Sequence, residues 1–271
     1  QTFMHKKFKI GFWVLPLILV VSTSTVFAKR AKYTEVEVTN GGSITGVVKF
    51  KGEMPPQVSV NLNNEKNSEF CLEAADTNEK GELLINNIEI KDESLKDAVV
   101  FIEHIEEGKP WAKRALKIDF KNCQAFPKTA VIRKTPKTKT RSLVVIENHD
   151  SGVLHNPMGF SIGEKTRKIF FKKWLLNKGA KVDVSKSLRF LKKDRDSHFY
   201  IECEQHLWMS VSSKVVWNPY HDISEKDGSF KIDQIPPGRY RIVVWHPYIG
   251  EKSVEVDISS SKTTQLDLAL P

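Results

Sequence analysis

Short stretches in which apolar and polar residues alternate recur along the chain. A period of two is typical of β-strands that bury one face. These stretches are bounded by turn-forming sequences such as Gly-Glu-Met-Pro-Pro at 52–56, Lys-Asp-Gly at 226–228 and Ile-Pro-Pro-Gly at 235–238. No regular alternation of strands with helices accompanies them, so the pattern predicts an all-β sandwich architecture. We expect strands at residues 43–50, 97–105, 116–120, 141–150, 198–203, 229–233, 239–246 and 252–258.

One region gives an ambiguous pattern. Residues 160–195 contain the sequence KIFFKKWLLNKGAKVD, at 168–183. It is compatible with two strands separated by a turn at Gly179, and equally with one amphipathic helical turn followed by a loop. Both interpretations stay open at this point.

The first residues have the composition of a secretory signal. Three lysines at positions 6–9 precede an apolar run at 10–21, and small residues lead to Val-Phe-Ala at 26–28. The apolar run is too short to span a bilayer, which favours a cleaved signal peptide over a membrane anchor. We therefore expect residues 1–28 to be removed and the remaining chain to be periplasmic or otherwise secreted, with no transmembrane segment.

The chain carries a basic excess that is spread thinly. Its formal net charge is +9, which falls to about +6 (9 − 3) without the three leader lysines. Such an excess favours an acidic protein partner or simply a solvated surface. No nucleic-acid-binding motif is present, so we expect no nucleic-acid partner.

Three cysteines in an exported protein suggest one disulfide and one thiol that is kept free for a reason. Cys71 and Cys123 have no histidine or methionine close in sequence. The third cysteine lies in CEQHLWM, where Cys203, His206 and Met209 follow the spacing C-x2-H-x2-M. The economical assignment pairs Cys71 with Cys123 and reserves Cys203 for a metal.

Two separated stretches resemble the halves of one small module. SITGVVKFKGEMPP at 43–56, followed by DAVVFIE, resembles the opening half of a carboxypeptidase regulatory-like domain, a transthyretin-like sandwich. SEKDGSFKIDQIPPGRYRIVVWHPYIG at 224–250 resembles its closing half. In that family the halves are adjacent. The resemblance therefore implies a discontinuous domain at 29–109 and 218–271, with a second β domain at 110–217 inserted in it.

The inserted stretch resembles the cupredoxins. VVIENHDSGVLHN ends at Asn156, and HFYIECEQHLWM ends at Met209, with the short C-x2-H-x2-M loop of the amicyanin type. A blue-copper site takes two imidazoles and a thiolate in a plane, with a weak axial thioether. Carried over, the resemblance implies His155, Cys203 and His206 as in-plane ligands and Met209 as the axial one. It gives Asn156 the role of tying the two ligand loops together.

Two neighbouring residues are alternatives within the same stretch. His149 follows a strand-like run and could replace His155 as a ligand. Met158 lies three residues past His155 and could approach the ion in place of Met209. For the other histidines outside the predicted signal peptide we expect structural or surface roles. They are His104, His198, His221 and His246.

The resemblance implies one type 1 copper ion and an exported electron carrier that cycles Cu(II)/Cu(I) with a redox partner protein. The alternatives are copper binding or sequestration without redox turnover, and a metal-free structural or binding module of the cell envelope. We expect no enzymatic activity, because the sequence has neither an H-x-H pair for a second copper centre nor an H-E-x-x-H motif.

Overall fold

We describe the protein from a computed structural model that places residues 33–112, 114–134, 144–163 and 167–271. The predicted signal peptide at 1–28 lies outside these residues. Within them, no helix is both long enough and apolar enough to cross a membrane.

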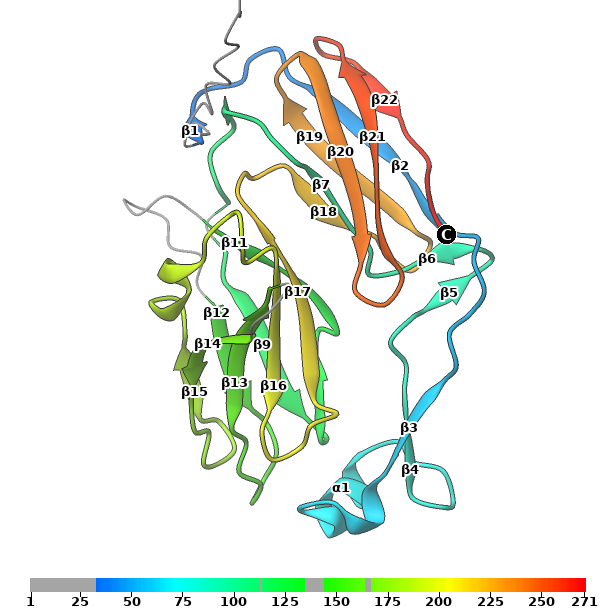
Figure 1. Ribbon diagram of the computed structural model, residues 1–271, viewed down its shortest axis with the longest axis vertical. Helices are drawn as coiled ribbons and strands as arrows, with labels where there is room; N and C mark the ends of the chain where they lie inside the picture. Colours follow the sequence, from blue (N-terminus) through cyan, green and yellow to red (C-terminus); the bar gives the residue numbers. More distant parts are fainter. Residues whose placement is uncertain (1–32, 113, 135–143, 164–166) are drawn as a thin grey trace, which may run out of the picture. The chain divides into compact units, whose positions relative to one another are not determined.

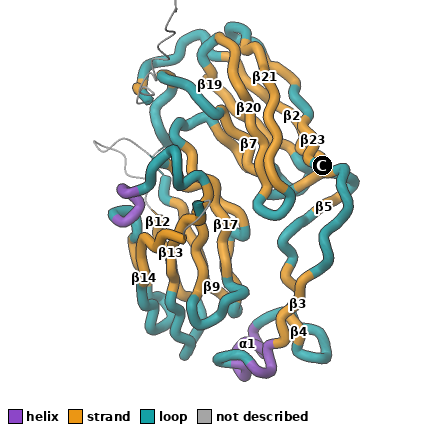
Figure 2. Tube along the Cα trace, in the orientation of Figure 1, coloured by secondary structure: helices purple, strands orange, loops and turns teal. Residues whose placement is uncertain are grey.

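The described chain is built almost wholly from β-strands (Figures 1 and 2), which confirms the all-β prediction. Among the described residues one α-helix occurs, α1 (Ser68–Ala74), together with two single-turn 3-10 helices, η1 (Leu62–Asn64) and η2 (Ser187–Phe190). Each of the strands expected from the sequence overlaps an observed strand.

The strands between residues 116 and 216 form one sandwich, which we call the inner sandwich. One sheet has the strand order β10-β9-β12-β15 and the other the order β11-β17-β16-β13-β14. Four of the seven neighbouring pairs in these two sheets are not consecutive in sequence, and two of them, β9/β12 and β11/β17, are parallel. This is the Greek-key sandwich expected from the resemblance to cupredoxins. The strands are β9 (Leu116–Lys121), β10 (Gln124–Phe126), β11 (Thr129–Arg133), β12 (Val144–Asn148), β13 (Pro157–Ile162), β14 (Arg167–Lys172), β15 (Lys181–Asp183), β16 (His198–Cys203) and β17 (Ser210–Val216).

Strands that precede the inner sandwich in the sequence pair with strands that follow it. One sheet has the order β18-β7-β20-β21 and the other the order β19-β2-β6-β5, with β22 and β23 also pairing with β2. We call this second pair of sheets the outer sandwich. The strands are β2 (Gly42–Phe50), β5 (Ile90–Lys91), β6 (Ser94–Leu95), β7 (Val99–Ile102), β18 (His221–Ile223), β19 (Ser229–Ile235), β20 (Gly238–His246), β21 (Gly250–Ile258), β22 (Thr263–Gln265) and β23 (Leu268–Leu270).

The domain boundaries given above stay a prediction. Residues 32–271 group as one compact unit, so their division into domains is not marked by a gap in contacts. A further small sheet pairs β1 (Thr34–Glu35) with β8 (Glu107–Gly108).

Between β2 and β7 the chain makes an excursion that the sequence pattern did not predict. Strands β3 (Val58–Asn61) and β4 (Glu82–Ile85) pair antiparallel and enclose η1 and α1. We call residues 58–85 the hairpin segment. It exposes most of β3, and its buried apolar residues Leu62, Cys71, Ala75 and Leu83 belong to the hydrophobic core of the inner sandwich. The segment therefore has no core of its own and depends on that sandwich for burial.

The described residues of the ambiguous region 160–195 contain strands and the 3-10 helix η2, and no α-helical turn. Gly179, with φ of +83°, lies in the turn before β15, as the first interpretation expected. However, β14 and β15 belong to different sheets, so they are not a hairpin pair.

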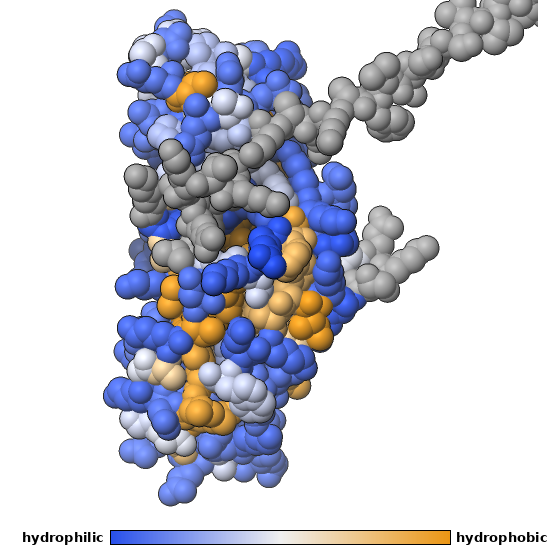
Figure 3. All heavy atoms as spheres, turned by 90° about the vertical axis from the view of Figure 1, so that its left-hand side faces the viewer, coloured by the Kyte–Doolittle hydropathy of each residue, from blue (hydrophilic) through white to orange (hydrophobic). Residues whose placement is uncertain are grey.

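The face of the protein shown in Figure 3, viewed from the left of Figure 1, has apolar side chains gathered over the inner sandwich. The large apolar side chains that the described residues of this part of the chain expose are Phe126, Ile162, Ile169, Trp174, Leu176, Phe190 and Leu207.

Candidate metal centre

Cys203 is the last residue of β16, and the alternation along that strand directs it into the core. The strand buries Phe199, Ile201 and Cys203 and leaves the intervening residues partly exposed. After Cys203 the chain turns back at once into β17. The Cys203 N–H donates to the Met209 carbonyl at 3.0 Å, and the His206 N–H donates to the Cys203 carbonyl at 3.2 Å. These bonds fold the loop so that the His206 ring returns to the cysteine.

His155 approaches from the neighbouring strand. It precedes β13, whose first residue, Pro157, lies directly opposite Cys203 in the antiparallel pair β13/β16. The backbone of His155 exchanges two hydrogen bonds with Leu175, of 3.1 and 2.8 Å. Adjacent antiparallel strands thus bring together two residues that are far apart in sequence.

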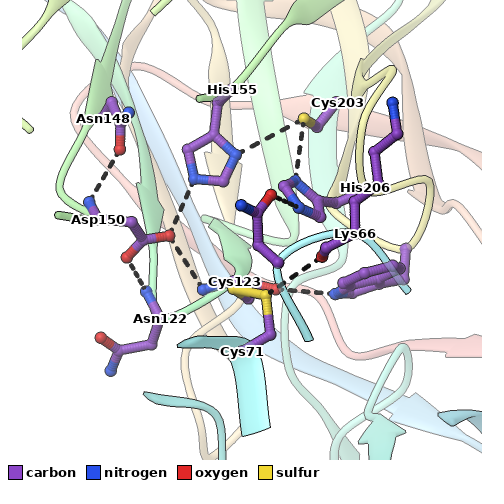
Figure 4. The surroundings of a disulfide bond; sticks show 11 residues. Lys66, Cys71, Asn122, Cys123, Asn148, Asp150, His155, Cys203 and His206 are labelled. Atoms are coloured by element: carbon purple, nitrogen blue, oxygen red, sulfur yellow. Dashed lines mark hydrogen bonds and ion pairs between the residues drawn. A yellow bond between two sulfur atoms is a disulfide. The ribbon is translucent and has the colours of Figure 1, made fainter. Parts of the chain in front are cut away.

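The three side chains converge in a fully buried cluster (Figure 4). The Cys203 Sγ lies 3.6 Å from Nδ1 of His155 and 3.6 Å from Nδ1 of His206. The side chains of all three residues are 0% exposed. A metal held in a trigonal plane by one thiolate and two imidazoles separates sulfur from nitrogen by about 3.7 Å, given metal–ligand bonds of about 2.0–2.3 Å. The observed spacing therefore fits a single ion between the three donors.

Met209 is also fully buried and belongs to the same core cluster as Cys203. The alternative thioether, Met158, is placed differently. It pairs with Glu202 across β13/β16, one position away from Cys203. Because successive residues of a strand face opposite sides, Met158 lies on the face of the sheet away from the cluster. The geometry favours Met209.

His149, the alternative to His155, lies outside the cluster. Its Nε2 is 3.0 Å from Asp119 Oδ1 and 3.9 Å from Glu147 Oε2. The Lys181 ammonium, at 3.1 Å, also pairs with Glu147. These solvent-accessible side chains form a mixed group of acidic and basic residues on and beside neighbouring strands.

Each histidine ring uses its other nitrogen for a second contact. Nε2 of His155 is 2.9 Å from Asp150 Oδ2, and Nε2 of His206 is 3.2 Å from Asn67 Oδ1. When Nε2 carries the proton and donates it to these oxygens, Nδ1 is free to bind a metal. No sequence pattern predicted that Asp150 and Asn67 would contact these rings. Asp150 sits five positions before His155, and Asn67 comes from the distant hairpin segment.

Asn156 links the two loops of the cluster. Its backbone N–H donates to Cys203 Sγ at 3.4 Å, and its Nδ2 donates to Glu204 Oε2 at 2.8 Å. The carboxylate of Glu204 also accepts from Lys172 at 2.5 Å. The residue next to His155 is thereby tied to the residue next to Cys203.

The surroundings favour the thiolate form of Cys203. Burial by itself raises the pKa of the thiol, but hydrogen bonds from His155, His206 and the Asn156 N–H outweigh it and lower the pKa to about 6. For His155 burial acts in the opposite direction and lowers the pKa, but the hydrogen bonds to Asp150 and Cys203 outweigh it, so the pKa is raised. Thiolate is the form that binds metals.

Cys71 and Cys123 form a disulfide next to the cluster (Figure 4), with a Cα–Cα distance of 5.5 Å. This confirms the pairing expected from the sequence and leaves Cys203 as the free cysteine. Structural disulfides are typical of proteins outside the cytoplasm.

Residues 159–163 form a G-x-S-x-G pentapeptide, a motif that carries the nucleophilic serine in some hydrolases. Its Ser161 lies within β13, is 1% exposed and donates to Asp196 Oδ1 at 2.6 Å. A nucleophilic serine in this motif occupies an exposed turn between a strand and a helix. The position of Ser161 does not meet that requirement.

Comparisons with known proteins give distant similarities. A copper-containing nitrite reductase from Thermus scotoductus is 15% identical over 40% of this chain and about a quarter (24%) of its own, with a TM-score of 0.28. The TIE protein of Bacillus anthracis is 11% identical over 86% of this chain and 51% of its own, with a TM-score of 0.17. GBS52, the minor pilin of Streptococcus agalactiae, is 10% identical over 84% of this chain and 94% of its own, with a TM-score of 0.16.

The family model of polysaccharide lyase family 4, domain II, matches residues 220–266, within the outer sandwich. No curated protein matches the chain. All three TM-scores are below 0.5, so we base the interpretation of the cluster on its own geometry.

Proposed function

We propose that the protein binds one copper ion in a type 1 site made by His155, Cys203 and His206, with Met209 as the axial donor. The observation that carries the proposal is the convergence of one thiol sulfur and two Nδ1 atoms, at 3.6 Å, in a site closed to solvent. A thiolate with two imidazoles and a thioether is the donor set of blue-copper centres.

The site supports electron transfer better than substrate chemistry. Copper supplies a one-electron Cu(II)/Cu(I) couple when it is bound. The protein fixes the donors on adjacent strands and holds both rings by their outer nitrogens, so the donors need little rearrangement between oxidation states. Four protein donors would fill the coordination positions of the ion and leave none for a substrate. We therefore propose an electron carrier rather than an enzyme.

A redox partner protein and an exported location belong to this proposal. The disulfide and the signal-like first 28 residues support a periplasmic or secreted protein. Two strongly exposed apolar residues lie close to proposed ligands. Leu207 follows His206 in sequence, and Trp174 precedes Leu175, whose backbone pairs with that of His155. Exposed apolar side chains near a buried centre suit protein docking, and the basic excess favours an acidic partner.

Copper sequestration without redox turnover is the second candidate function. The complete burial of both histidines favours it, because a buried ion exchanges slowly. A metal-free structural or binding module is less well supported, since such a protein has no need of a buried thiol beside two histidines.

Titration of the metal-free protein with Cu(II) tests the proposal. We expect one equivalent to bind and to give an intense absorption at about 600 nm from charge transfer between the Cys203 thiolate and Cu(II), as in blue-copper sites. Reduction should bleach the band and reoxidation should restore it repeatedly. Binding of one equivalent without reversible cycling would favour sequestration. No binding would refute both.

A further inference from the structure

The hairpin segment, residues 58–85, lies against the candidate metal centre although it branches from the outer sandwich. Its helix α1 is joined to the turn between β9 and β10 by the Cys71–Cys123 disulfide. Its Lys66 donates to Gln205 at 2.6 Å, next to His206 in the ligand loop. Trp208 of that loop donates to the Cys123 carbonyl at 2.8 Å. The disulfide therefore lies between the segment and the ligand loop.

One arm of this arrangement leads to His155. Asn122 and Cys123 form a tight turn in which both residues have φ of +52°. Asp150 accepts hydrogen bonds from both backbone N–H groups, at 2.6 and 3.1 Å, and its Oδ2 contacts His155 Nε2. Figure 4 shows this chain from the disulfide through Asp150 to His155. The half-cystine at 123 is one hydrogen bond from the residue that orients the first ring.

The other arm leads to His206. Asn67 precedes α1 in a left-handed conformation, with φ of 56° and ψ of 32°, and its carbonyl accepts from the Cys71 N–H at 2.9 Å. Its side-chain Oδ1 contacts His206 Nε2 at 3.2 Å. The half-cystine at 71 is thus one helical turn from the residue that orients the second ring. His206 is 0% exposed, with a side chain of the hairpin segment bonded to its outer nitrogen.

We propose that Asn67 and Asp150 are the positioning residues of the two histidines, that the Cys71–Cys123 disulfide keeps both in place, and that the hairpin segment is a cover that limits copper exchange. This rests on the proposed copper site. For the ion to leave, His206 must swing out or a chelator must reach it. A swing of His206 breaks its contact with Asn67, and we expect a chelator to approach His206 from the same side.

The rate of copper loss distinguishes this role from a purely structural one. The full-length protein is loaded with one equivalent of Cu(II) and mixed with excess EDTA, and bound copper is followed by metal analysis after gel filtration. Asn67→Gly removes the acceptor oxygen while tolerating the left-handed backbone. Removing an outer partner of a metal-bound histidine typically costs about 10–100-fold in affinity. We expect release to be at least about tenfold faster.

Two matched variants isolate the hydrogen bond. Asn67→Asp keeps an acceptor oxygen at the same position, so it should release copper at nearly the parent rate. Asn64→Gly changes an exposed asparagine of the same segment and should also leave the rate unchanged.

The double variant Cys71→Ala/Cys123→Ala should release copper at least about tenfold faster. If that variant fails to fold, the comparison of Asn67→Gly with Asn67→Asp still decides the matter.

The outcomes separate the two proposals. Stoichiometric copper binding with equal release rates in the parent, Asn67→Gly and the double variant would overturn the cover and leave the copper site standing. Equal acceleration by Asn64→Gly and Asn67→Gly would reduce the effect to general loosening of the segment and also overturn it. A parent protein that binds no copper would refute both proposals.

Discussion

Pro157 lies directly opposite Cys203 on neighbouring antiparallel strands, and this pairing determines how the candidate metal centre is assembled. It sets the segment that ends in His155 beside the loop that begins at Cys203, so the backbone N–H of Asn156 reaches the cysteine sulfur at 3.4 Å. Two ligand positions separated by almost fifty residues are therefore neighbours because of strand register alone.

Substitution of two of the proposed ligands should have different effects. Cys203→Ser replaces the thiolate with a harder, weaker ligand, so the blue band and redox cycling should disappear. Met209→Leu removes only a weak axial donor, and copper should remain bound and coloured with a raised reduction potential. Visible spectra and potentiometry of both variants check this. An unchanged spectrum and potential in Met209→Leu would show that Met209 is not a ligand.

Asp150→Asn should weaken copper binding. The substitution removes the negative charge that holds the Nε2 of His155, at 2.9 Å. Burial alone would raise the pKa of Asp150, but hydrogen bonds from His155, Cys123 and Asn122 outweigh it and lower the pKa, which favours the carboxylate. We expect an affinity lower by about 10–100-fold, measured by competition with a chelator. Asp119→Asn, which alters the separate group around His149, is the matched control and should leave the affinity unchanged. Equal affinities for both variants would contradict the role of Asp150.

Stability of the metal-free protein should fall in mild acid because of His246. Its side chain is 1% exposed, and burial lowers its pKa to about 4 from the ordinary 6.5. Between these values the unfolded chain binds a proton that the folded protein does not. The free energy of unfolding therefore falls as the pH falls, by about 1.4 kcal/mol per pH unit from this group.

The comparison of variants isolates that contribution. His246→Asn keeps an acceptor for the Tyr248 N–H and cannot titrate. Between pH 7 and pH 5 it should lose about 2 kcal/mol less stability than the parent in urea unfolding. His104→Asn, at an exposed histidine, should behave like the parent. A His246→Asn variant with the parent's pH dependence would show that folding does not lower the pKa of His246.

The disulfide should contribute strongly to stability. It closes a loop of 52 residues, for which the loss of chain entropy in the unfolded state corresponds to about 4 kcal/mol. Cys71→Ala/Cys123→Ala should lower the free energy of unfolding by roughly that amount, measured with urea on metal-free protein. Thiol counting on the unfolded parent should find one reactive cysteine, Cys203. Finding three would contradict the bridge.

Much of the fold and of the proposed ligand set could be predicted from local pattern. The alternation at 198–203 matches β16, and the spacing C-x2-H-x2-M marks a turn that folds back on its own cysteine. The choice between His149 and His155 could not be made from the sequence with the same certainty, because it depends on which residue pairs across strands. The exclusion of Met158 likewise follows from register.

The hairpin segment could not be predicted because its structure depends on contacts far away in sequence. Its helix has seven residues, too few to be stable alone, and its apolar residues are buried only against the inner sandwich. Asn67 carries no motif at all. Its importance lies in a contact with His206, 139 positions away, that only the folded chain creates.

Crystallography of the copper-loaded protein with data collected at the copper absorption edge tests the central claim most directly. We predict a single anomalous peak within about 2.0–2.3 Å of Cys203 Sγ and of Nδ1 of both His155 and His206. A peak beside Asp119, Glu147 and His149 instead, or fully loaded crystals with no peak between the three buried donors, would contradict the assignment of this cluster as the copper site.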